Sequence, residues 1–312
     1  MITGARILIT GATGQIGGDF ADDLAPRNEV WAIARYSRPG SRERLESIGV
    51  KTVAGDFAEG DFGGLPDDFD YVLHFAANTK PGVAEVGMVQ NAEGTGLLMH
   101  HCRKAKAFLH VSTCGVYTDH ADRTKKKVET DDVGGATPHS PNYGPTKTAA
   151  EGVARTMARL YELPTTIARI NCGYGGPHDD GGLPGMNLDA LIAGRPIRLP
   201  KTYRVMESPV HTDDMLSHLE PLLNAASVPA IVVNWGGGEG VAVEDWCRYM
   251  AELIGVEPVF DFTDESALPH TITDTERGRS IGMTWKVGWR EGMRRMIQAR
   301  HPEIRLRDTA PA

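Results

Sequence analysis

The hydrophobic pattern of the first half of the chain alternates short apolar runs with longer segments of helical spacing. Apolar runs at 7–10, 30–34, 51–54, 71–75, 108–112 and 165–170 predict six strands. After the first run, Ile16, Phe20 and Leu24 recur every four residues, which places them on one face of a helix. Further helices are expected over about 83–106 and 142–161. This alternation predicts a doubly wound parallel sheet of the α/β class, with helices on both faces.

The regularity drops after about residue 173. Glycine- and proline-rich stretches near 175–185 predict loops, an apolar run at 230–235 predicts a strand that returns to the main sheet, and a short strand is expected just before His211. Helices are expected near 187–193, 213–226, 243–255 and 288–299. We expect a main domain of residues 1–175 with about 209–242, and a smaller α/β C-terminal lobe of about 176–208 and 243–300. Residues 301–312 are expected to form a tail.

Composition narrows the class of protein. The 312 residues are 41% hydrophobic and 24% charged, which excludes a disordered chain, and the net charge of −8 argues against nucleic-acid binding. An apolar stretch of membrane-spanning length and a secretory signal are both lacking, so we expect no membrane partner and a cytoplasmic protein. The four cysteines are far apart without a CxxC pair, which predicts reduced thiols and no metal site. The lysine run at 125–127 predicts a solvated loop.

A glycine-rich turn follows the first predicted strand. The segment Gly11-Ala12-Thr13-Gly14-Gln15-Ile16-Gly17 is a GxxGxxG pattern between a strand and an amphipathic helix. In such a turn the first glycine permits the sharp exit from the strand, the second lets the backbone approach a pyrophosphate, and the third lets the helix pack on the sheet. Amides at the helix N-terminus favour phosphate. The pattern predicts a Rossmann dinucleotide-binding domain, with Thr13, Gln15 and Ile16 beside the cofactor.

The end of the second strand indicates which dinucleotide binds. NAD-binding domains usually place an acidic residue there to hold the ribose 2′-hydroxyl. Here no carboxylate occurs between Val30 and Arg42, and Ala34 is followed by Arg35, Ser37 and Arg38. A guanidinium pairs with a 2′-phosphate and stacks on adenine. NADP(H) is therefore the favoured cofactor, and NAD(H) stays an alternative because these arginines can also be ordinary surface charges.

A candidate catalytic pair lies in the second long helix. Tyr143 and Lys147 are one helical turn apart, and Pro145 between them is tolerated in a first turn. A tyrosine is a poor acid at neutral pH, but a nearby cation lowers its pKa. Thr113 follows a predicted strand and supplies a hydroxyl. Together the three residues predict a proton donor and a polarising group for a carbonyl beside a nicotinamide.

The motifs and their order along the chain resemble those of the extended short-chain dehydrogenases/reductases, and the resemblance extends to about residue 298. This superfamily holds sugar-nucleotide epimerases and dehydratases, dihydroflavonol reductases and hydroxysteroid dehydrogenases, and the end of the second strand resembles the reductase branches more. The matching segments are residues 10–17, Gly55-Asp56-Phe57, His74-Phe75-Ala76-Ala77, Asn91-Ala92-Glu93-Gly94-Thr95, Val111 to Tyr117, Tyr143 to Lys147, Arg169-Ile170-Asn171 and Pro209 to Asp214.

The resemblance implies roles for the matching residues. Tyr143 would be the acid/base, Lys147 its partner and Thr113 the third member of the triad. Other cofactor-binding positions would be Gly11, Gly14, Asp56 and Phe57 against the adenine, Ala76 and Ala77 where the chain passes the cofactor, Asn91 under it, and Ile170. Thr113, Cys114, Asn171 and Arg204 are the candidate substrate contacts. The main domain would hold the cofactor and the smaller lobe the substrate, and a homodimer would form through the helices near 83–106 and 142–161.

Departures from the family pattern bear on the substrate. Dehydratases of the family carry Asp-Glu after the catalytic threonine, where this chain has Cys114-Gly115. Epimerases usually place an arginine for the diphosphate where this chain has Glu207, a carboxylate expected to repel it, and Arg204 could substitute only if its loop shifts. The leading hypothesis is an NADP(H)-dependent oxidoreductase that reduces a carbonyl, or oxidises the matching alcohol, of a small to medium organic substrate. The alternatives are a nucleotide-sugar epimerase or 4-ketoreductase, and a non-catalytic NADP-binding protein, against which the intact triad counts.

Overall fold

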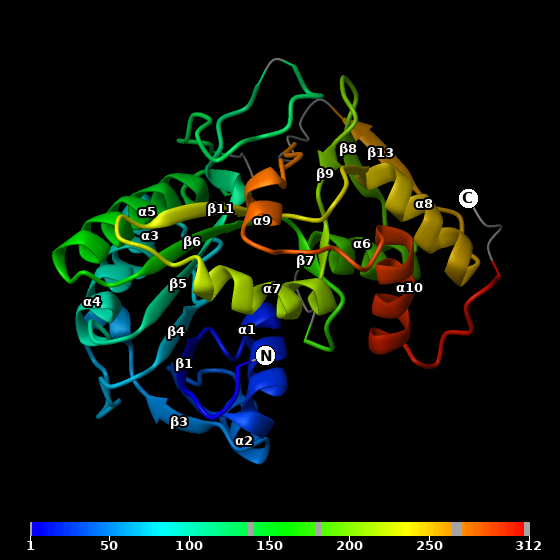
Figure 1. Ribbon diagram of the computed structural model, residues 1–312. Coiled ribbons are helices and arrows are strands. Elements are labelled where there is room, and N and C mark those ends of the chain that lie inside the picture. The colour runs from blue at the N-terminus through cyan, green and yellow to red at the C-terminus, as the bar shows by residue number, and fades with distance from the viewer. Residues whose placement is uncertain (1, 121, 137–139, 179–181, 264–269, 309–312) are drawn as a thin grey trace.

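The main sheet has seven parallel strands with helices on both faces (Figure 1). The computed structural model describes residues 2–120, 122–136, 140–178, 182–263 and 270–308. The strand order is β11-β6-β5-β4-β1-β2-β3, and every neighbouring pair is parallel. The strands are β1 Arg6–Thr10, β2 Glu29–Ala34, β3 Lys51–Ala54, β4 Tyr71–His74, β5 Ala107–Thr113, β6 Thr165–Ile170 and β11 Ile231–Trp235. The predicted doubly wound α/β fold is confirmed.

Alternate residues of the strands belong to two hydrophobic cores, one on each face of the sheet. Ile7 and Ile9 of β1 pack in one core, and Leu8 between them packs in the other. The first core is covered by α1 Gln15–Leu24 and α7 Thr212–Asn224, and the second by α4 Gly94–His101 and α5 Tyr143–Leu160. Short segments α2 Ser41–Ser47, α9 Glu276–Ser280, η1 Ala25–Arg27, η2 Phe57–Glu59 and η4 Cys114–Val116 complete this part.

The helix expected over 83–106 is divided and shorter than predicted. It consists of α3 Ala84–Gly87, a π-helical segment η3 Met88–Glu93, and α4, which ends at His101. Gly87 and Gly96 let it lie close to α5, because a Cβ at these positions would approach Thr146 Cγ2 to 2.8 Å and Val153 Cγ1 to 3.0 Å. The glycines that permit this approach also weaken the regular helix.

The C-terminal lobe is built on three helices and short strand pairs (Figure 1). Trp246 and Met250 on one helix and Met293 and Met296 on another are buried in a third hydrophobic core. The helices are α6 Leu183–Ile192, α8 Val243–Ile254 and α10 Trp289–Arg300. The ends of α8 and α10 lie within one residue of the predicted spans, whereas α6 begins four residues earlier than predicted, inside the expected loop. The strand pairs are β8 Ile197–Pro200 with β13 Phe260–Thr263, β9 Met206–Glu207 with β12 Val241–Ala242, and β7 Gly173–Tyr174 with β10 Val210–His211.

Two segments predicted to be loose make specific contacts. Lys127, expected in a solvated loop, is buried: its Nζ donates to the Thr118 carbonyl at 2.6 Å and its backbone N–H to the Ile272 carbonyl at 2.7 Å. In the expected tail, the Arg307 N–H donates to the Leu253 carbonyl at 2.8 Å. Residues 309–312 lie outside the described residues. Both segments are short and polar, so hydrophobic periodicity did not indicate their contacts.

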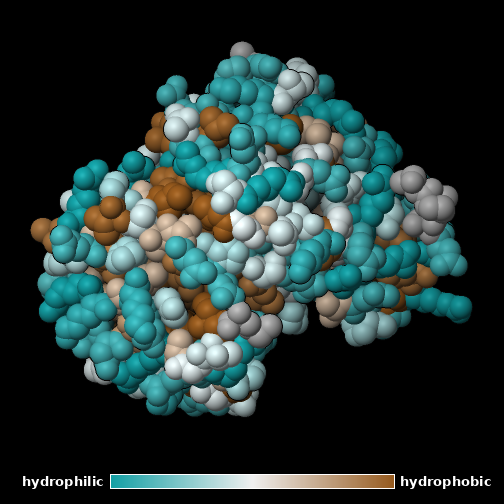
Figure 2. All heavy atoms as spheres, in the orientation of Figure 1, coloured by the Kyte–Doolittle hydropathy of each residue, from teal (hydrophilic) through white to brown (hydrophobic). Residues whose placement is uncertain are grey.

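Hydrophilic residues cover much of the face seen in Figure 2, with hydrophobic residues gathered in smaller areas. Among the helices of the described ranges, none combines the length and the apolar character that a membrane crossing requires. The same residues contain no group of three or more His, Cys, Asp or Glu side chains placed to hold a metal ion.

Candidate functional site

The glycine turn between β1 and α1 is closely packed against its surroundings. Gly11 has a positive φ of +74°, and a Cβ there would lie 2.7 Å from the Ala76 backbone nitrogen. A Cβ on Gly17 would lie 2.4 Å from the Gly11 carbonyl oxygen. The Gly14 N–H donates to that same oxygen at 2.9 Å. The turn therefore accepts no side chain at Gly11 or Gly17, which is the packing that a close approach of a pyrophosphate requires.

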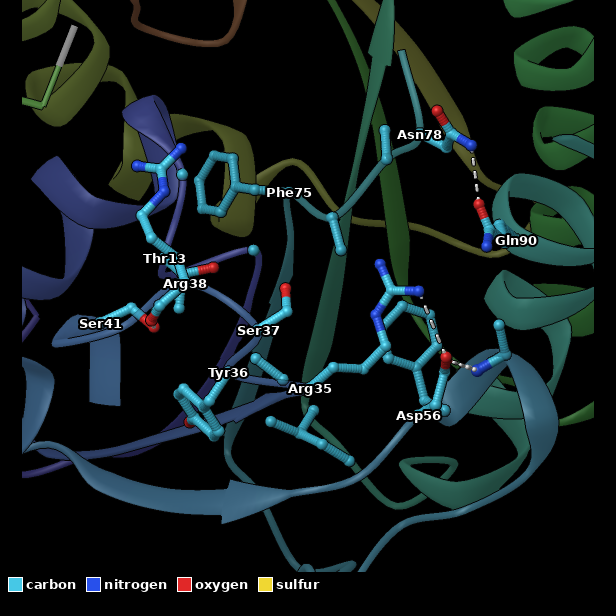
Figure 3. Close-up of a pocket in the computed structure, with 18 of the residues that line it drawn as sticks. Thr13, Arg35, Tyr36, Ser37, Arg38, Ser41, Asp56, Phe75, Asn78 and Gln90 are labelled. Atoms are coloured by element: carbon cyan, nitrogen blue, oxygen red, sulfur yellow. Dashed lines mark hydrogen bonds and ion pairs between the residues drawn. The ribbon is translucent and has the colours of Figure 1, made fainter. Parts of the chain in front are cut away.

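A cavity of about 720 Å³ opens beside this turn at the carboxyl ends of β1, β2 and β4 (Figure 3). Its size fits a dinucleotide, since sites for such ligands run from ~300 to ~1,000 Å³. Ten predicted cofactor residues line it: Gly11, Thr13, Gly14, Arg35, Ser37, Arg38, Asp56, Phe57, Ala76 and Ala77. Sequence reasoning missed Ile33, Ala34, Tyr36, Ser41, Gly55, Ala58, Phe75, Asn78, Thr79, Lys80 and Gln90, most of which directly adjoin the predicted residues.

Arg35 and Asp56 lie side by side in the cavity wall, with their charged groups directed toward each other (Figure 3). Their Nη1 and Oδ2 atoms are 3.7 Å apart, and the Arg35 side chain is 64% exposed. The Asp56 carboxylate also accepts the Ala58 N–H at 3.1 Å, which fixes the turn after β3. An exposed guanidinium that is only loosely paired can turn to another anion, so this pair is suited to contact a ribose or its phosphate.

A buried histidine sets the position of the chain after β4. The Ala76 N–H donates to Thr10 Oγ1 at 3.2 Å, and the Thr10 hydroxyl donates to His74 Nδ1 at 2.7 Å. On the other side of the ring, His74 Nε2 donates to Thr95 Oγ1 at 3.0 Å, because the Thr95 hydroxyl itself donates to the Asn91 carbonyl. Burial lowers the pKa of His74 to about 3, so the ring stays neutral. Sequence reasoning assigned no role to Thr10 or His74.

Asn91 lies behind the cavity wall. Its Oδ1 accepts the Asn78 N–H at 2.8 Å, and its Nδ2 donates to the Asn78 carbonyl at 3.0 Å and to Thr146 Oγ1 at 3.1 Å. Next to it, Asn78 Nδ2 donates to Gln90 Oε1 at 2.8 Å (Figure 3). Asn91 thus joins the cavity edge to α5, while its own side chain does not line the cavity.

Three other predicted cofactor residues meet around Gly173 instead of lining the cavity. Gln15 Nε2 donates to the Gly173 carbonyl at 2.9 Å. A Cβ on Gly173 would lie 3.2 Å from Ile170 Cδ1 and 3.3 Å from Ile16 Cδ1. These contacts connect the glycine turn to the segment that follows β6, on the side where the C-terminal lobe begins.

The candidate catalytic residues come together at the carboxyl end of β5. Thr113 ends that strand, Tyr143 begins α5, and Lys147 follows one turn later. Burial raises the pKa of Tyr143 to about 12, although a hydrogen bond with Thr113 lowers it. Lys147 Nζ donates to the Val111 carbonyl at 2.9 Å and lies 3.5 Å from His110 Nε2, and burial lowers its pKa to about 8. The expectation that Lys147 lowers the pKa of Tyr143 is therefore not met by these contacts, in which the ammonium is directed to β5.

The candidate substrate residues make different contacts in the structure. Cys114 directly follows Thr113 in the chain, and its Sγ donates a hydrogen bond to the Arg169 carbonyl at 3.2 Å. The Asn171 amide donates to the Thr271 carbonyl at 2.7 Å, so it ties the two lobes together. Arg204 pairs with Asp245 on α8 and lines a cavity of about 260 Å³ whose lining includes none of the three triad residues.

Glu207 differs from its expected role as a diphosphate-repelling carboxylate. It is 2% exposed, and burial raises its pKa well above the ordinary range, against a hydrogen bond with Asn171. Burial therefore works against the charged form of this carboxyl group. This weakens the argument that a negative charge on Glu207 repels a nucleotide diphosphate.

Known proteins with related activities are similar to this chain. The profile of the NAD dependent epimerase/dehydratase family matches residues 7–231. A dTDP-glucose 4,6-dehydratase from Mycolicibacterium smegmatis is 30% identical over 239 residues, which cover 72% of this chain and 70% of that protein. The UDP-glucuronic acid 4-epimerase from Bacillus cereus, solved with UDP-glucuronic acid and NAD, superposes with a TM-score of 0.80 at 21% identity over 94% of this chain and 98% of that one. A UDP-N-acetylglucosamine 4-epimerase from Methanobrevibacter ruminantium gives 0.81 at 17% identity over 96% and 98%.

These similar proteins are sugar-nucleotide dehydratases and epimerases. The expected closer likeness to the reductase branches is not confirmed by them. They give no support to a preference for NADP either, because the Bacillus cereus structure contains NAD. At 21% and 17% identity the two solved structures show a shared fold and nothing finer.

Proposed function

Because the chain belongs to the NAD dependent epimerase/dehydratase family, we propose that it oxidises or reduces a ring carbon of a nucleotide-activated sugar, as an epimerase or a 4-ketoreductase. The observation that carries the proposal is the meeting of Thr113, Tyr143 and Lys147 at the carboxyl end of β5, the same edge of the sheet at which the dinucleotide-sized cavity opens. The sugar-nucleotide activities of the similar proteins support this substrate class. Burial raises the pKa of Glu207 and so disfavours its charged form, which weakens the charge objection to this substrate class.

Each of the three residues has a distinct task in this chemistry. Tyr143 exchanges a proton with the substrate oxygen, and the Thr113 hydroxyl orients that oxygen. The Lys147 ammonium, with a pKa of about 8, stays charged at neutral pH and favours the phenolate form of Tyr143 when it lies near. The bound nicotinamide would supply or accept the hydride. The residues that line the cavity, among them Thr13, Asp56 and Ala76, would hold that dinucleotide.

Elimination of water is disfavoured as the outcome. A dehydration needs an acid and a base at the carbons next to the oxidised one. The residues that follow Thr113 are Cys114 and Gly115, and burial raises the pKa of the Cys114 thiol well above its usual range. Neither residue can act as an acid or a base near neutral pH. This favours epimerisation or ketone reduction over the dehydration performed by the relative from Mycolicibacterium smegmatis.

The experiment that tests the proposal supplies UDP- and dTDP-sugars to the purified protein, with and without added NADPH. An epimerase interconverts two sugar nucleotides without added reductant, whereas a 4-ketoreductase consumes NADPH with a 4-keto sugar nucleotide. Products are separated chromatographically. Conversion of any sugar nucleotide supports the proposal. Failure across the panel by a protein that binds the dinucleotide would overturn it.

We also propose that the end of β2 accepts NADP(H). Ala34 leaves no carboxylate there, and Arg35, Ser37 and Arg38 line the cavity. A 2′-phosphate would compete with Asp56 for the Arg35 guanidinium. The test is a calorimetric titration with NADP⁺ and NAD⁺ after removal of any nucleotide that copurifies. Tight retention of NAD⁺ with weak NADP⁺ binding would overturn the preference and favour an epimerase.

A second candidate function is reduction of a small organic carbonyl with NADPH. The arginine-rich end of β2 favours this function, because these arginines suit the 2′-phosphate of NADPH. A carbonyl reductase binds a new molecule of NADPH in each catalytic cycle. It differs from the main proposal in not requiring a nucleotide on the substrate. Competition by UDP or dTDP would therefore separate the two: inhibition supports the nucleotide-sugar enzyme, and indifference supports the reductase.

We further propose a homodimer through the face formed by α3 and α4 together with α5. Val83, Val86 and Leu97, on and just before these helices, are 58%, 42% and 40% exposed, which is unusual for side chains of this kind. Sedimentation analysis tests this proposal. A concentration-independent monomer would contradict it.

A further inference from the structure

Two acceptors on β5 hold the side chain of Lys147. Its Nζ donates to the Val111 carbonyl at 2.9 Å and lies 3.5 Å from His110 Nε2. Lys147 is 1% exposed and His110 is 0% exposed. Because an ammonium group only donates, His110 Nε2 is the acceptor in this contact. The cation of the candidate triad is therefore fixed between α5 and β5 by a histidine to which the proposed chemistry has given no task.

His110 belongs to a row of buried polar side chains that crosses β1, β4 and β5. It is the register partner of His74 on β4, and the centroids of the two rings are 5.3 Å apart. The His74 ring accepts the Thr10 hydroxyl at 2.7 Å, and the oxygen of that hydroxyl accepts the N–H of Ala76 in the cavity wall. The row thus extends from the wall of the dinucleotide-sized cavity to Lys147, and His110 is its last member before the lysine.

The charge and the tautomer of His110 follow from this position. An imidazolium would place a second cation against Lys147, and burial together with the Lys147 charge lowers the pKa of His110 well below its usual range. The ring is therefore neutral and carries one proton. With Nε2 turned to the ammonium, this proton lies on Nδ1, for which the described part of the chain provides no hydrogen-bond partner. A buried polar atom without a partner calls for an explanation, and the contact of Nε2 with Lys147 supplies one.

We propose that His110 is a positioning residue of the triad: its Nε2 accepts a hydrogen bond from Lys147 and, together with the Val111 carbonyl, fixes the ammonium group against β5. The catalytic consequence rests on the proposed function, because only there does Lys147 act as the cation of the triad. The hydrogen bond itself does not depend on the substrate. His110 does not line the cavity, so it acts through Lys147.

Two substitutions separate this role from a structural one. In His110→Phe an aromatic ring remains but the acceptor is lost, so the charged form of Lys147 is less stabilised and its pKa falls below about 8. The fall of kcat on the alkaline side should then move lower by about one pH unit, as expected for the loss of one hydrogen bond to a charged group. In His110→Gln the amide oxygen replaces Nε2 as acceptor, and the fall returns toward its wild-type pH. A histidine that only fills space would be replaced by phenylalanine without this shift.

The other charged or titratable groups around Lys147 are the same in all these variants. Glu151 on the same helix raises the pKa of Lys147, and Tyr143 lies one helical turn before it. On β4, the Lys147 charge lowers the pKa of His74. Because no substitution at His110 changes these groups, the difference between His110→Phe and His110→Gln isolates the acceptor at Nε2.

The first experiment does not depend on turnover and records long-range proton–nitrogen NMR spectra of the full chain with isotope-labelled histidines. The His110 signals are those lost in His110→Gln, and His100→Gln on α4, an exposed histidine hydrogen-bonded to Tyr161, is the matched control. His110 is expected to carry its proton on Nδ1, and its Nε2 signal should shift as Lys147 loses its proton at about pH 8. Lys147→Met should abolish this shift. A proton on Nε2 near neutral pH, or the same Nε2 signal in wild type and Lys147→Met, would overturn the positioning role.

The second experiment measures kcat against pH for wild type, His110→Gln and His110→Phe with a sugar nucleotide that wild type converts, and Tm values check folding. A fall of kcat at the same alkaline pH in all three would overturn the role of His110 and leave the proposed function intact. Lack of turnover with every sugar nucleotide in wild type would overturn the proposed function, whereas the NMR comparison would still decide the contact of His110 with Lys147. That comparison also decides the matter if His110→Phe does not fold.

Discussion

The buried pair of Arg169 on β6 and Glu151 on α5 supports the catalytic end of β5 and allows a quantitative test. Arg169 Nε and Nη2 donate to the two carboxylate oxygens of Glu151 at 2.9 and 2.7 Å, and Ser112 Oγ donates to the same carboxylate at 2.6 Å. The side chains are 4% and 5% exposed. The Arg169 guanidinium also lies 4.7 Å from the ring of Tyr117.

The perturbation is Glu151→Gln, which keeps the volume and removes the charge. Arg169 then stays buried without its counter-charge, and breaking such a pair from one side costs about 3–5 kcal/mol. Glu151 also raises the pKa of Lys147. Removing Glu151 therefore lowers the pKa of Lys147 below about 8. We expect kcat to fall where Lys147 loses its proton, and this fall then occurs at a lower pH.

Urea unfolding, followed by circular dichroism, measures the loss of stability. The matched control is Glu244→Gln, which disrupts the surface pair with Arg248 on α8, where the Arg248 side chain is 56% exposed. Surface pairs contribute about 0–1 kcal/mol. A loss below about 1 kcal/mol in Glu151→Gln, equal to that of the control, would refute the view that this pair is a buried, mutually dependent unit.

Four further perturbations follow from the site. Tyr143→Phe removes the proton-exchanging hydroxyl, so turnover is expected to fall about 10²- to 10⁴-fold while calorimetric cofactor affinity is kept; wild-type turnover would contradict the mechanism. Gly17→Ala places a methyl group 2.4 Å from the Gly11 carbonyl oxygen, so both Tm and dinucleotide binding should fall, and an unchanged Tm would contradict the packing. Arg35→Ala should weaken NADP⁺ binding about 10-fold more than NAD⁺ binding, and equal effects would remove the 2′-phosphate argument. The lowered pKa of Lys147, about 8, means that its ammonium is lost as the pH rises through that value; kcat should then fall, and a flat alkaline profile would speak against it.

The sequence predicted the main sheet well because each strand there is a buried apolar run between turns. The ends of β3 and β6 agree with the predicted runs, and β1, β2, β4, β5 and β11 differ from them by one residue at one or both ends. The helix expected over 83–106 ends earlier, at His101, and contains the π-helical segment η3. Its Gly87 and Gly96 pack closely against α5, a contact between segments far apart in the chain. Periodicity along the chain carries no information on such contacts.

The site was predicted where one local motif supplies the geometry. The glycine turn and the Tyr143 to Lys147 spacing depend on neighbouring residues, and the structure brings both to the carboxyl edge of the sheet. The raised pKa of Glu207 could not be predicted, because it results from the burial of β9 in the folded protein. The ion pair of Arg204 with Asp245 likewise could not be predicted, because it joins two segments that only the fold brings together.

The central claim is that Tyr143, aided by Thr113 and Lys147, exchanges a proton with a sugar oxygen while the carbon that bears this oxygen exchanges a hydride with a nicotinamide. The most direct test mixes the protein, loaded with NAD⁺ or NADP⁺, with a panel of UDP- and dTDP-sugars in a stopped-flow instrument and follows nicotinamide reduction by absorbance. Wild type should show a sugar-dependent rise in reduced nicotinamide, and Tyr143→Phe should show none at matched cofactor occupancy. A rise of equal rate in Tyr143→Phe, or no rise with any sugar nucleotide in cofactor-saturated wild type, would contradict the claim.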